Sequence, residues 1–465
     1  MSDLLYKKKN TFEEKDDAFI NKAYDYCEGY KAFLDSSYIE RPGIEAVKKQ
    51  AEEKGYLPFD FKKEYHTGDK FYHIQKERSM LLVSVGKEEL ENGFNMVAAH
   101  IDCPRLDLKP SPLFDDSGIA YFKTHYYGGI KKYQWVTIPL ILCGRVYKKD
   151  GTAVDVVIGK DRTDPVFYIS DLLPHLAREQ ESKSLYSGIS GEDLKVIIGT
   201  RRNKKSENDD KKIDGEDSPK YFAMKLLNEK YGITEEDLFS AELSFVPNYE
   251  PRDIGLDRSL IASAGHDDRI CCYPAVSALF EETVPERTSV VLLADKEEIG
   301  SVGITGMQGN FWYDILSATA ENAGKNKYMM FENSTALSAD VAAAYDPSYS
   351  GVYDKGNSAD VNCGFALYKY SGAGGKSNAS EADPKFMAEL RNLFDKKNLE
   401  YQFYELGKID AGGGGTVSKY IAAKNITVVD MGVPILSMHA PYEAAAKTDI
   451  YNMYLAVKAY LEEFR

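Results

Sequence analysis

The segment TSVVLLADKEEIGS, residues 288–301, indicates the fold class. Its apolar run VVLLA is typical of a strand buried in a parallel sheet, and it ends in charged residues. The carboxyl end of such a strand is where an open α/β sheet delivers side chains to a site. Glu297 and Glu298 lie at this end, before the glycine-containing stretch IGSVGITG. An acidic pair at a solvated helix start is the competing interpretation, but these glycines favour a backbone close to something bound.

Strands alternate with helices on both sides of this segment. FNMVAAHID (94–102) is another apolar run with a polar end, and YMMFENSTALSAD (328–340) is strand-like and ends in Asp340. Alternating strands and helices predict an α/β fold with a mainly parallel central sheet flanked by helices. Apolar spacing predicts helices at 19–37, 41–55, 268–284, 311–324, 383–399, 416–425 and 447–464, and strands at 401–406 and 426–438.

The pattern changes between residues 104 and 255. Short strand-like runs dominate there, with Lys-Asp-Gly at 149–151 as a hairpin-type turn. Since 465 residues exceed one ordinary core, we expect two domains. A discontinuous catalytic domain would comprise 1–103 and 256–465, interrupted by a β-rich domain at 104–255. Within the insertion, the charged run 201–218 predicts a solvated loop.

Composition limits the possible functions and compartments. The net charge of −15 argues against nucleic acid as a main partner, because such binders need a basic surface. The sequence contains no apolar run of about 18 residues, so we expect no membrane-spanning helix. The first residues lack the apolar core of a signal peptide. Six cysteines without a C-x-x-C pair suit a reducing compartment. We therefore expect a cytoplasmic protein.

Potential metal ligands follow apolar strands or lie beside glycines in five segments. These are AAHID (98–102), AGHDDR (264–269), LLADKEEIGS (292–301), LSAD (337–340) and SMHAPYE (437–443). In the first segment, His100 and Asp102 point the same way if they lie on a strand. Asp102 could then hold the second nitrogen of His100 and fix its tautomer. For this pair alone, a hydrogen-bonded histidine at a strand end is the stronger interpretation.

The acidic residues of the other segments have competing interpretations as well. One of Asp267 and Asp268 fits a helix N-cap, which would leave the other to bridge metals. Adjacent glutamates diverge, so Glu298 could bind a metal while Glu297 faces a metal-bound water. Asp340 and His439 complete the set, although neither signal is specific alone.

The ligand set indicates the class of metal. Two histidines and three carboxylates, without cysteine, suit Zn²⁺, Co²⁺ or Mn²⁺. Five ligands are too many for one tetrahedral zinc ion, and they suit two ions that share a carboxylate. Such paired ions are typical of hydrolases.

The five segments resemble, in order, those of the M18 family of aspartyl-aminopeptidase-like enzymes. The resemblance rests on AAHIDCPRLDLKP, AGHDDR, DKEEIGSVG, SADVAAAYDPSY and SMHAPYE, and KTHYYGGIKKYQWVTIPL suggests the bacterial branch. It implies two zinc ions per chain, with His100 and Asp340 on one. Glu298 and His439 would bind the other, and Asp267 would bridge both.

The resemblance also implies roles for the remaining residues. Glu297 would be the general base that removes N-terminal residues from peptides, and Asp102 would orient His100. The inserted β-rich domain would serve dimerisation and line the substrate entry, within a homo-oligomer that is commonly a dodecamer. Lys376 matches a lysine that could receive an acidic side chain, although a solvated loop lysine is equally consistent. Tyr133 stands where eukaryotic members carry a histidine, so the preference for acidic residues is open.

Two other functions fit the same residues. A deacylase or amidase acting on N-acyl amino acids could use the same metal centre. A self-assembling scaffold with a decayed site is a non-catalytic alternative, but the presence of every ligand type argues against it.

Overall fold

The computed structural model describes residues 4–203 and 217–465, so most of the predicted charged loop at 201–218 lies outside the described residues. The chain forms two compact units. The first comprises Met1–Cys103, Pro251–Met438 and Glu443–Arg465, and the second comprises Pro104–Glu250 and His439–Tyr442. The two units meet along the chain at 103/104 and 250/251, where the sequence predicted boundaries at 103/104 and 255/256.

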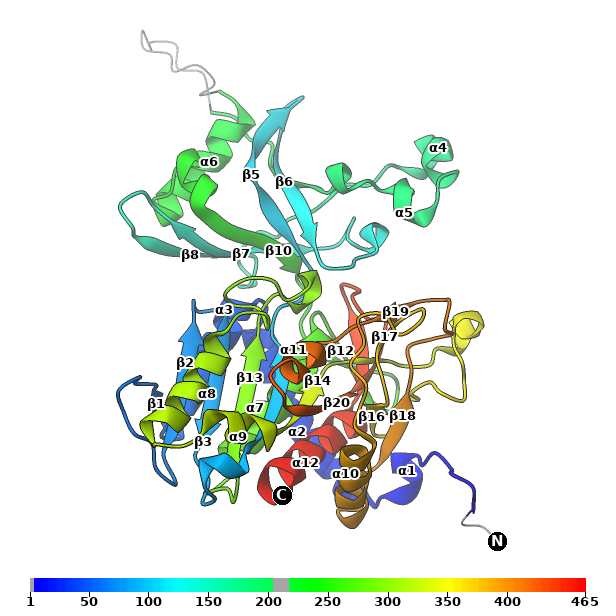
Figure 1. The fold of residues 1–465 in the computed structure, drawn as a ribbon. Helices are drawn as coiled ribbons and strands as arrows, with labels where there is room; N and C mark the ends of the chain where they lie inside the picture. Colours follow the sequence, from blue (N-terminus) through cyan, green and yellow to red (C-terminus); the bar gives the residue numbers. More distant parts are fainter. Residues whose placement is uncertain (1–3, 204–216) are drawn as a thin grey trace. The chain divides into compact units, whose positions relative to one another are not determined.

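A nine-stranded sheet organises the first unit (Figure 1). Its four central strands, β13, β4, β14 and β20, run parallel, and antiparallel pairings occur toward both edges. The predicted α/β class with a mainly parallel centre is confirmed. In spatial order the strands are β1 (Leu57–Pro58), β2 (Lys70–Gln75), β3 (Ser79–Ser84), β13 (Thr288–Ala294), β4 (Phe94–His100), β14 (Thr335–Ala339), β20 (Thr427–Gly432), β16 (Phe365–Tyr368) and β18 (Tyr401–Tyr404).

Helices cover both faces of this sheet, because its central strands are apolar on both sides. Along β4, Val97 and Ala99 join one hydrophobic core, whereas Met96 and Ala98 join the other. This alternation follows from the two-residue period of a strand. The first core is packed by α2 (Asp17–Ser36), α3 (Glu40–Glu53), α7 (His266–Glu281), α10 (Pro384–Lys396) and α12 (Lys447–Glu463). The second is packed by α8 (Phe311–Asn322), α9 (Lys327–Glu332) and α11 (Ser418–Ala422).

One predicted element differs in this unit. The strand expected over 328–340 begins only at Thr335, and the preceding residues form α9. Asn326 caps α9 by accepting hydrogen bonds from the N–H groups of Tyr328 and Met329. The capping asparagine outweighs the strand-like appearance of Tyr-Met-Met-Phe. A second, five-stranded sheet of this unit contains β11 (Arg252–Ile254), β12 (Leu260–Ser263), β22 (Glu443–Ala446), β21 (Pro434–Leu436) and β15 (Ala342–Ala343).

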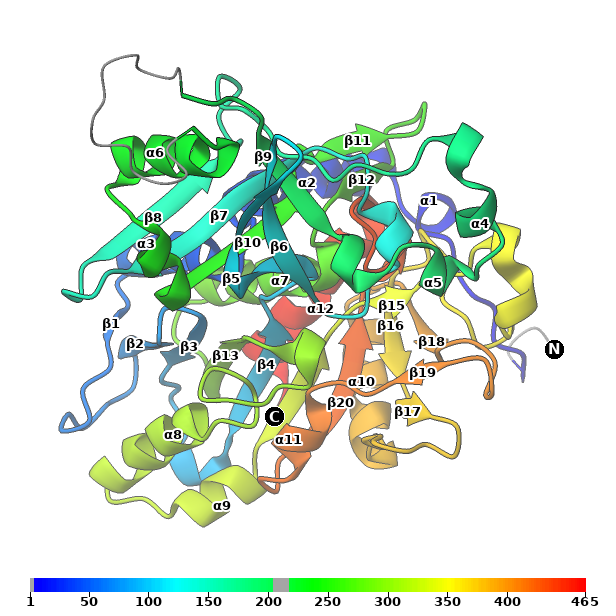
Figure 2. The same ribbon diagram turned by 90° about the horizontal axis from the view of Figure 1, so that it is seen from above.

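The second unit is built on a six-stranded antiparallel sheet (Figure 2). The long helix α6 (Pro219–Tyr231) starts at Pro219 with Ser218 as its N-cap and ends at the left-handed Gly232. Apolar residues of the strands, including Phe122 and Phe245, form a separate core. The β character predicted for the insertion is therefore present. The strands are β8 (Ala153–Ile158), β7 (Leu140–Tyr147), β10 (Ala241–Pro247), β5 (Arg105–Asp116), β6 (Ile119–Tyr127) and β9 (Lys195–Gly199).

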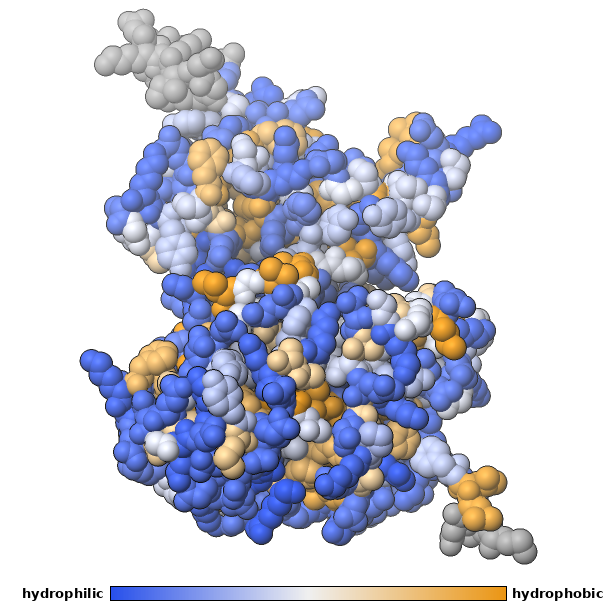
Figure 3. All heavy atoms as spheres, viewed as in Figure 1, coloured by the Kyte–Doolittle hydropathy of each residue, from blue (hydrophilic) through white to orange (hydrophobic). Residues whose placement is uncertain are grey.

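Hydrophilic residues dominate the face shown in Figure 3, with hydrophobic residues in small groups. All six cysteines are buried and carry free thiols. Across the described ranges 4–203 and 217–465, the helices are too short or too polar to cross a membrane.

Candidate metal centre

The predicted ligands of the first unit gather at one edge of the central sheet. His100 is the last residue of β4, and Asp340 directly follows β14, which runs parallel to β4. On the other side of β4, Ala294 at the end of β13 is paired with His100. The carboxyl ends of parallel strands meet at one edge, so these side chains converge although their segments are far apart in sequence.

Three of the predicted ligands form a buried cluster. The Nε2 atom of His100 lies 3.1 Å from Asp267 Oδ1 and 3.6 Å from Asp340 Oδ1. One donor atom from each residue lies within 4.8 Å of the other two. The His100 and Asp267 side chains are almost inaccessible to water. An imidazole and two carboxylates at these separations fit a divalent zinc ion, which accepts nitrogen and oxygen donors together.

The electrostatics of this cluster favour a cation. Burial opposes a charged His100, but hydrogen bonds to Asp102, Asp267 and Asp340 outweigh it and raise the pKa of His100 well above its usual value. Burial also raises the pKa of Asp340, because the carboxylate loses water and Asp267 adds a like charge. Two buried carboxylates facing one imidazole repel each other unless a positive charge lies between them. The proton on His100 supplies that charge when no metal is bound, and a metal ion held by the same three residues would supply it in place of the proton.

Asp102 connects the cluster to the segment that carries the two glutamates. Its Oδ1 atom lies 3.3 Å from His100 Nδ1 and also accepts a 3.1 Å hydrogen bond from the N–H of Glu297. Its Oδ2 atom accepts a 3.3 Å bond from the N–H of Glu298. The Asp102 side chain is fully buried. It can therefore orient His100 and hold the glutamate backbone at the same time.

Glu297 and Glu298 form a single turn of 3₁₀ helix, Glu297–Ile299, three residues beyond the end of β13. The turn starts and ends at left-handed residues, Lys296 with φ 67° and Gly300 with φ 92°. Burial is the main cause that raises the pKa of Glu297 to about 8, opposed by His100 and reinforced by Asp340 and other nearby carboxylates. A carboxyl with such a pKa can accept and return a proton near neutrality.

Asp267 and Asp268 lie in the first turn of α7, which begins after the left-handed Gly265. Gly265 precedes the first turn, but Asp267 and Asp268 have non-helical backbone angles, so the regular helix starts after them and the aspartate N-cap stays a prediction. Asp268 uses Oδ2 to accept a 3.2 Å hydrogen bond from the N–H of His100. The N–H of Asp267 donates to Glu443 Oε2 at 3.2 Å. Both aspartates are therefore held by residues of strands, His100 of β4 and Glu443 of β22.

Sequence reasoning missed the support of this turn by His266 and Tyr30. His266 Nδ1 lies 2.7 Å from the Tyr30 hydroxyl, and Nε2 lies 3.1 Å from the carbonyl oxygen of Ile261. Burial lowers the pKa of His266 to about 4, so the ring is neutral at pH 7. A neutral ring that donates through Nε2 accepts the Tyr30 O–H at Nδ1. His266 is thus committed to the fold, and only its place beside Asp267 could have drawn attention to it.

His439 belongs to the second compact unit, in the segment His439–Tyr442. Its Nδ1 atom lies 2.9 Å from the carbonyl oxygen of Gly129, which belongs to the same unit. A histidine that donates from Nδ1 to a carbonyl presents Nε2 as its ligating nitrogen. The assignment of His439 to the metal centre stays a prediction.

Lys376 is exposed and already engaged within its own loop. Its Nζ atom lies 2.8 Å from Glu381 Oε1 and 4.3 Å from the centre of the Tyr370 ring. The ion pair with Glu381 raises the pKa of Lys376. An acidic substrate side chain would have to compete with Glu381 for this cation, so its role in binding also stays a prediction.

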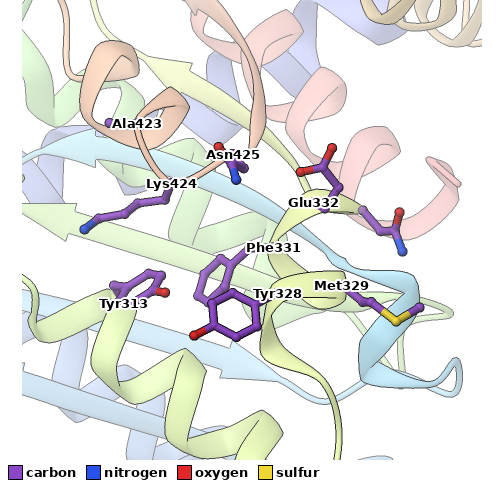
Figure 4. Close-up of a pocket in the computed structure, with 9 residues that line it drawn as sticks. Tyr313, Tyr328, Met329, Phe331, Glu332, Ala423, Lys424 and Asn425 are labelled. Atoms are coloured by element: carbon purple, nitrogen blue, oxygen red, sulfur yellow. The ribbon is translucent and has the colours of Figure 1, made fainter.

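A cavity of about 690 Å³ in the same unit contains none of the predicted site residues (Figure 4). It borders Asn333 and Asn425, each two residues before a parallel strand, β14 or β20. These are the amino ends of the strands, whereas His100 and Asp340 lie at carboxyl ends. The other lining residues are Tyr313, Tyr328, Met329, Phe331, Glu332, Ala423 and Lys424.

Comparisons with known proteins agree with this arrangement. Residues 33–461 match the family described as aminopeptidase I zinc metalloprotease (M18). A curated relative from Clostridium acetobutylicum, named a probable M18 family aminopeptidase 1, is 43% identical over 470 residues and covers 99% of both chains. The crystal structure of an M18 family aminopeptidase from Thermotoga maritima has a TM-score of 0.92 and 37% identity, covering 99% of this chain and 100% of that one.

A more distant structure shares the fold. The structure of the S. cerevisiae mApe1 dodecamer has a TM-score of 0.76 and 20% identity, covering 95% of this chain and 97% of its own. The family match spans most of the sequence, and the curated relative exceeds 40% identity over 99% of its length. The chain therefore belongs to the M18 family of zinc metalloproteases, the aminopeptidase I family.

Proposed function

We propose that this enzyme removes single residues from the amino ends of peptides at a centre of two zinc ions. His100 and Asp340 would bind one ion, Glu298 and His439 the other, and Asp267 both. The observation that carries the proposal is the convergence of His100, Asp267 and Asp340, whose donor atoms lie within 4.8 Å of one another. Co²⁺ or Mn²⁺ could replace zinc, since both accept the same nitrogen and oxygen donors.

Glu297 is the proton carrier in this proposal. Zinc, when bound, polarises the scissile carbonyl and lowers the pKa of the attacking water. Glu297 takes the proton from that water and returns it to the leaving amine, so one side chain serves as base and then as acid. The hydrogen bond that the backbone N–H of Glu297 donates to Asp102 holds the Glu297 carboxyl beside the ligand cluster during both proton transfers.

The substrate class can be tested with the zinc-reconstituted protein. We expect hydrolysis of aminoacyl p-nitroanilides that carry a free α-amine, and at least tenfold lower kcat/KM when the amine is acetylated. A panel of acidic, basic and apolar aminoacyl groups measures the preferred residue. Faster release from N-acetyl amino acids than from aminoacyl substrates would establish a deacylase instead.

The proposal also covers the assembly of the protein and its location in the cell. We infer a homo-oligomer in which the second unit serves dimerisation and shapes the substrate entry. Its expected size is a dodecamer, the assembly described for S. cerevisiae mApe1. We also infer a cytoplasmic location. Native mass spectrometry tests the assembly: twelve chains per particle support it, and a monomer contradicts it.

A further inference from the structure

Asp295 and Thr305 join the two ends of the loop that carries Glu297 and Glu298, and we call this pair the neck of the loop. Asp295 directly follows β13, and its side chain is fully buried. Its N–H donates to the carbonyl oxygen of Thr305 at 3.2 Å, and its Oδ2 atom accepts a 2.6 Å hydrogen bond from the Thr305 hydroxyl. Residues 295 and 305 are thus joined through backbone and side chain, which makes the intervening residues a closed loop.

The neck is held by a largely buried group of four charges. Arg78, at the end of the β2–β3 turn, places Nε 3.1 Å from Asp295 Oδ2 and Nη2 2.9 Å from Glu40 Oε1. Lys296 places Nζ 3.1 Å from the same Asp295 oxygen. Two carboxylates and two cations balance, which satisfies the requirement that buried charges be paired. Arg78 therefore fastens the loop to both α3 and the β2–β3 turn.

The tip of the loop is open to solvent. The side chains of Ile299, Val302 and Ile304 are 50%, 64% and 60% exposed, whereas Ser301 between them is buried. On the side of the sheet the glutamates are held by the Asp102 bonds to their N–H groups and by the Asp295 neck. At the other end of the turn, Gln308 and Tyr420 donate hydrogen bonds to the carbonyl oxygen of Gly300. The neck lies two residues before Glu297, so a shift there moves the carboxyl directly.

We propose that Arg78 and Asp295 are positioning residues for the Glu297–Glu298 turn, acting through the neck and not through contact with substrate. The inference rests on the proposed role of Glu297 as the base. Misplacing a reacting group by about 1 Å can lower turnover about 100-fold without affecting ground-state binding. Loss of the Arg78 cation therefore lowers kcat while KM and zinc content stay near their wild-type values.

The test compares Arg78→Met with Arg78→Lys in the zinc-reconstituted full chain. Arg78→Met is expected to lower kcat roughly 10- to 100-fold with KM changed less than about threefold. Arg78→Lys restores the charge and recovers a large part of that loss. Arg41→Met is the matched control, because Arg41 joins α3 to the same turn through the half-exposed Glu77, and it should stay within about twofold of wild type.

Hydrogen exchange gives a second readout that does not depend on catalysis. Arg78→Met should speed exchange of the amides of residues 295–306 at least about tenfold, and Arg41→Met should not. If Arg78→Met does not fold, Asp295→Asn serves instead, since it keeps an acceptor for Thr305 but loses the charge. The inference is overturned if Arg78→Met keeps the exchange rates and the kcat of the wild type. It is also overturned if Arg41→Met lowers kcat and speeds exchange as much as Arg78→Met does. If the wild-type enzyme hydrolyses no aminoacyl substrate, the proposed function is refuted, but the exchange measurement still tests whether Arg78 positions the turn.

Discussion

Asp102 uses one oxygen for two tasks: Oδ1 accepts a 3.1 Å hydrogen bond from the N–H of Glu297 and lies 3.3 Å from His100 Nδ1. Asp102 therefore helps to orient a metal ligand, with its backbone carbonyl oxygen 3.1 Å from His100 Nδ1 as well, and positions the proposed base. Since Oδ2 accepts the N–H of Glu298, a change at Asp102 affects three residues of the site together.

Asp102→Asn should weaken zinc binding and slow turnover together. An amide has a single acceptor oxygen, so it cannot receive the two glutamate N–H groups on separate oxygens as the carboxylate does. It also removes the negative charge 3.3 Å from His100 Nδ1, although the 3.1 Å contact of Nδ1 with the Asp102 backbone carbonyl oxygen remains. Loss of a partner that orients a ligand costs about 10- to 100-fold in metal affinity or activity. Competition with a zinc chelator and kcat measurements check this. Asp116→Asn, exposed at the end of β5, is the control, and wild-type zinc affinity in Asp102→Asn would contradict the expectation.

Tyr30→Phe should destabilise the turn that presents Asp267. The variant removes the hydroxyl 2.7 Å from buried His266 Nδ1, and an unsatisfied buried acceptor costs about 1–3 kcal/mol. We expect a lower melting temperature and weaker zinc binding. Tyr26→Phe is a matched control on the same helix, because its hydroxyl meets Ser277 Oγ at 2.7 Å, away from the ligands. Equal zinc affinity in the two variants would show that Tyr30 supports only the fold.

Glu282→Gln should stabilise the protein above pH 7 and leave it unchanged at pH 4. Burial is the main cause that raises the pKa of Glu282 from 4.5 to about 7. The raised pKa means that the folded state binds the proton more tightly than the unfolded state. The contribution of Glu282 to the free energy of unfolding is therefore fully present below pH 4.5 and is lost as pH rises through about 7. The shift corresponds to about 3 kcal/mol at most.

Melting temperatures of Glu282→Gln and wild type across pH 4 to 9 measure this effect. The difference should appear between the two pKa values and then level off. Glu286→Gln is the control, because that carboxylate is exposed and Lys87 lowers its pKa. A pH-independent difference for Glu282→Gln would mean that the carboxyl does not titrate in this range.

Glu381→Gln tests whether Lys376 faces the substrate. The variant frees Lys376 from its 2.8 Å ion pair, so the ratio of kcat/KM for acidic over neutral aminoacyl substrates should rise roughly two- to fivefold. Lys376→Met should lower the same ratio. An unchanged ratio in both variants would place Lys376 outside substrate recognition and leave it as a solvated loop lysine.

The sequence predicts best what depends on local pattern. Apolar runs such as VVLLA identify central strands, and polar residues at their ends identify candidate ligands, because parallel strands deliver their carboxyl ends to one edge. His100 and Asp340 lie together for this reason. The resemblance to the M18 family added the pairing of ligands with metals, which no local pattern contains.

Contacts between distant segments could not be predicted in this way. Tyr30 and His266 are 236 positions apart, and Arg78 meets Asp295 across 217 positions, so neither pairing leaves a periodic signal. The non-helical backbone of Asp267 and Asp268 after Gly265 likewise leaves no local signal in the sequence. The helix α9 was missed because a capping Asn326 outweighed the strand-like run after it.

The central claim is that Glu297 moves the proton at a centre of two zinc ions, and one measurement on Glu297→Gln tests it most directly. Metal content and kcat are determined on the same zinc-reconstituted sample, beside wild type. We predict two zinc ions per chain in both proteins and a kcat at least about 100-fold lower in the variant. Near-normal hydrolysis by Glu297→Gln with zinc bound would contradict this role.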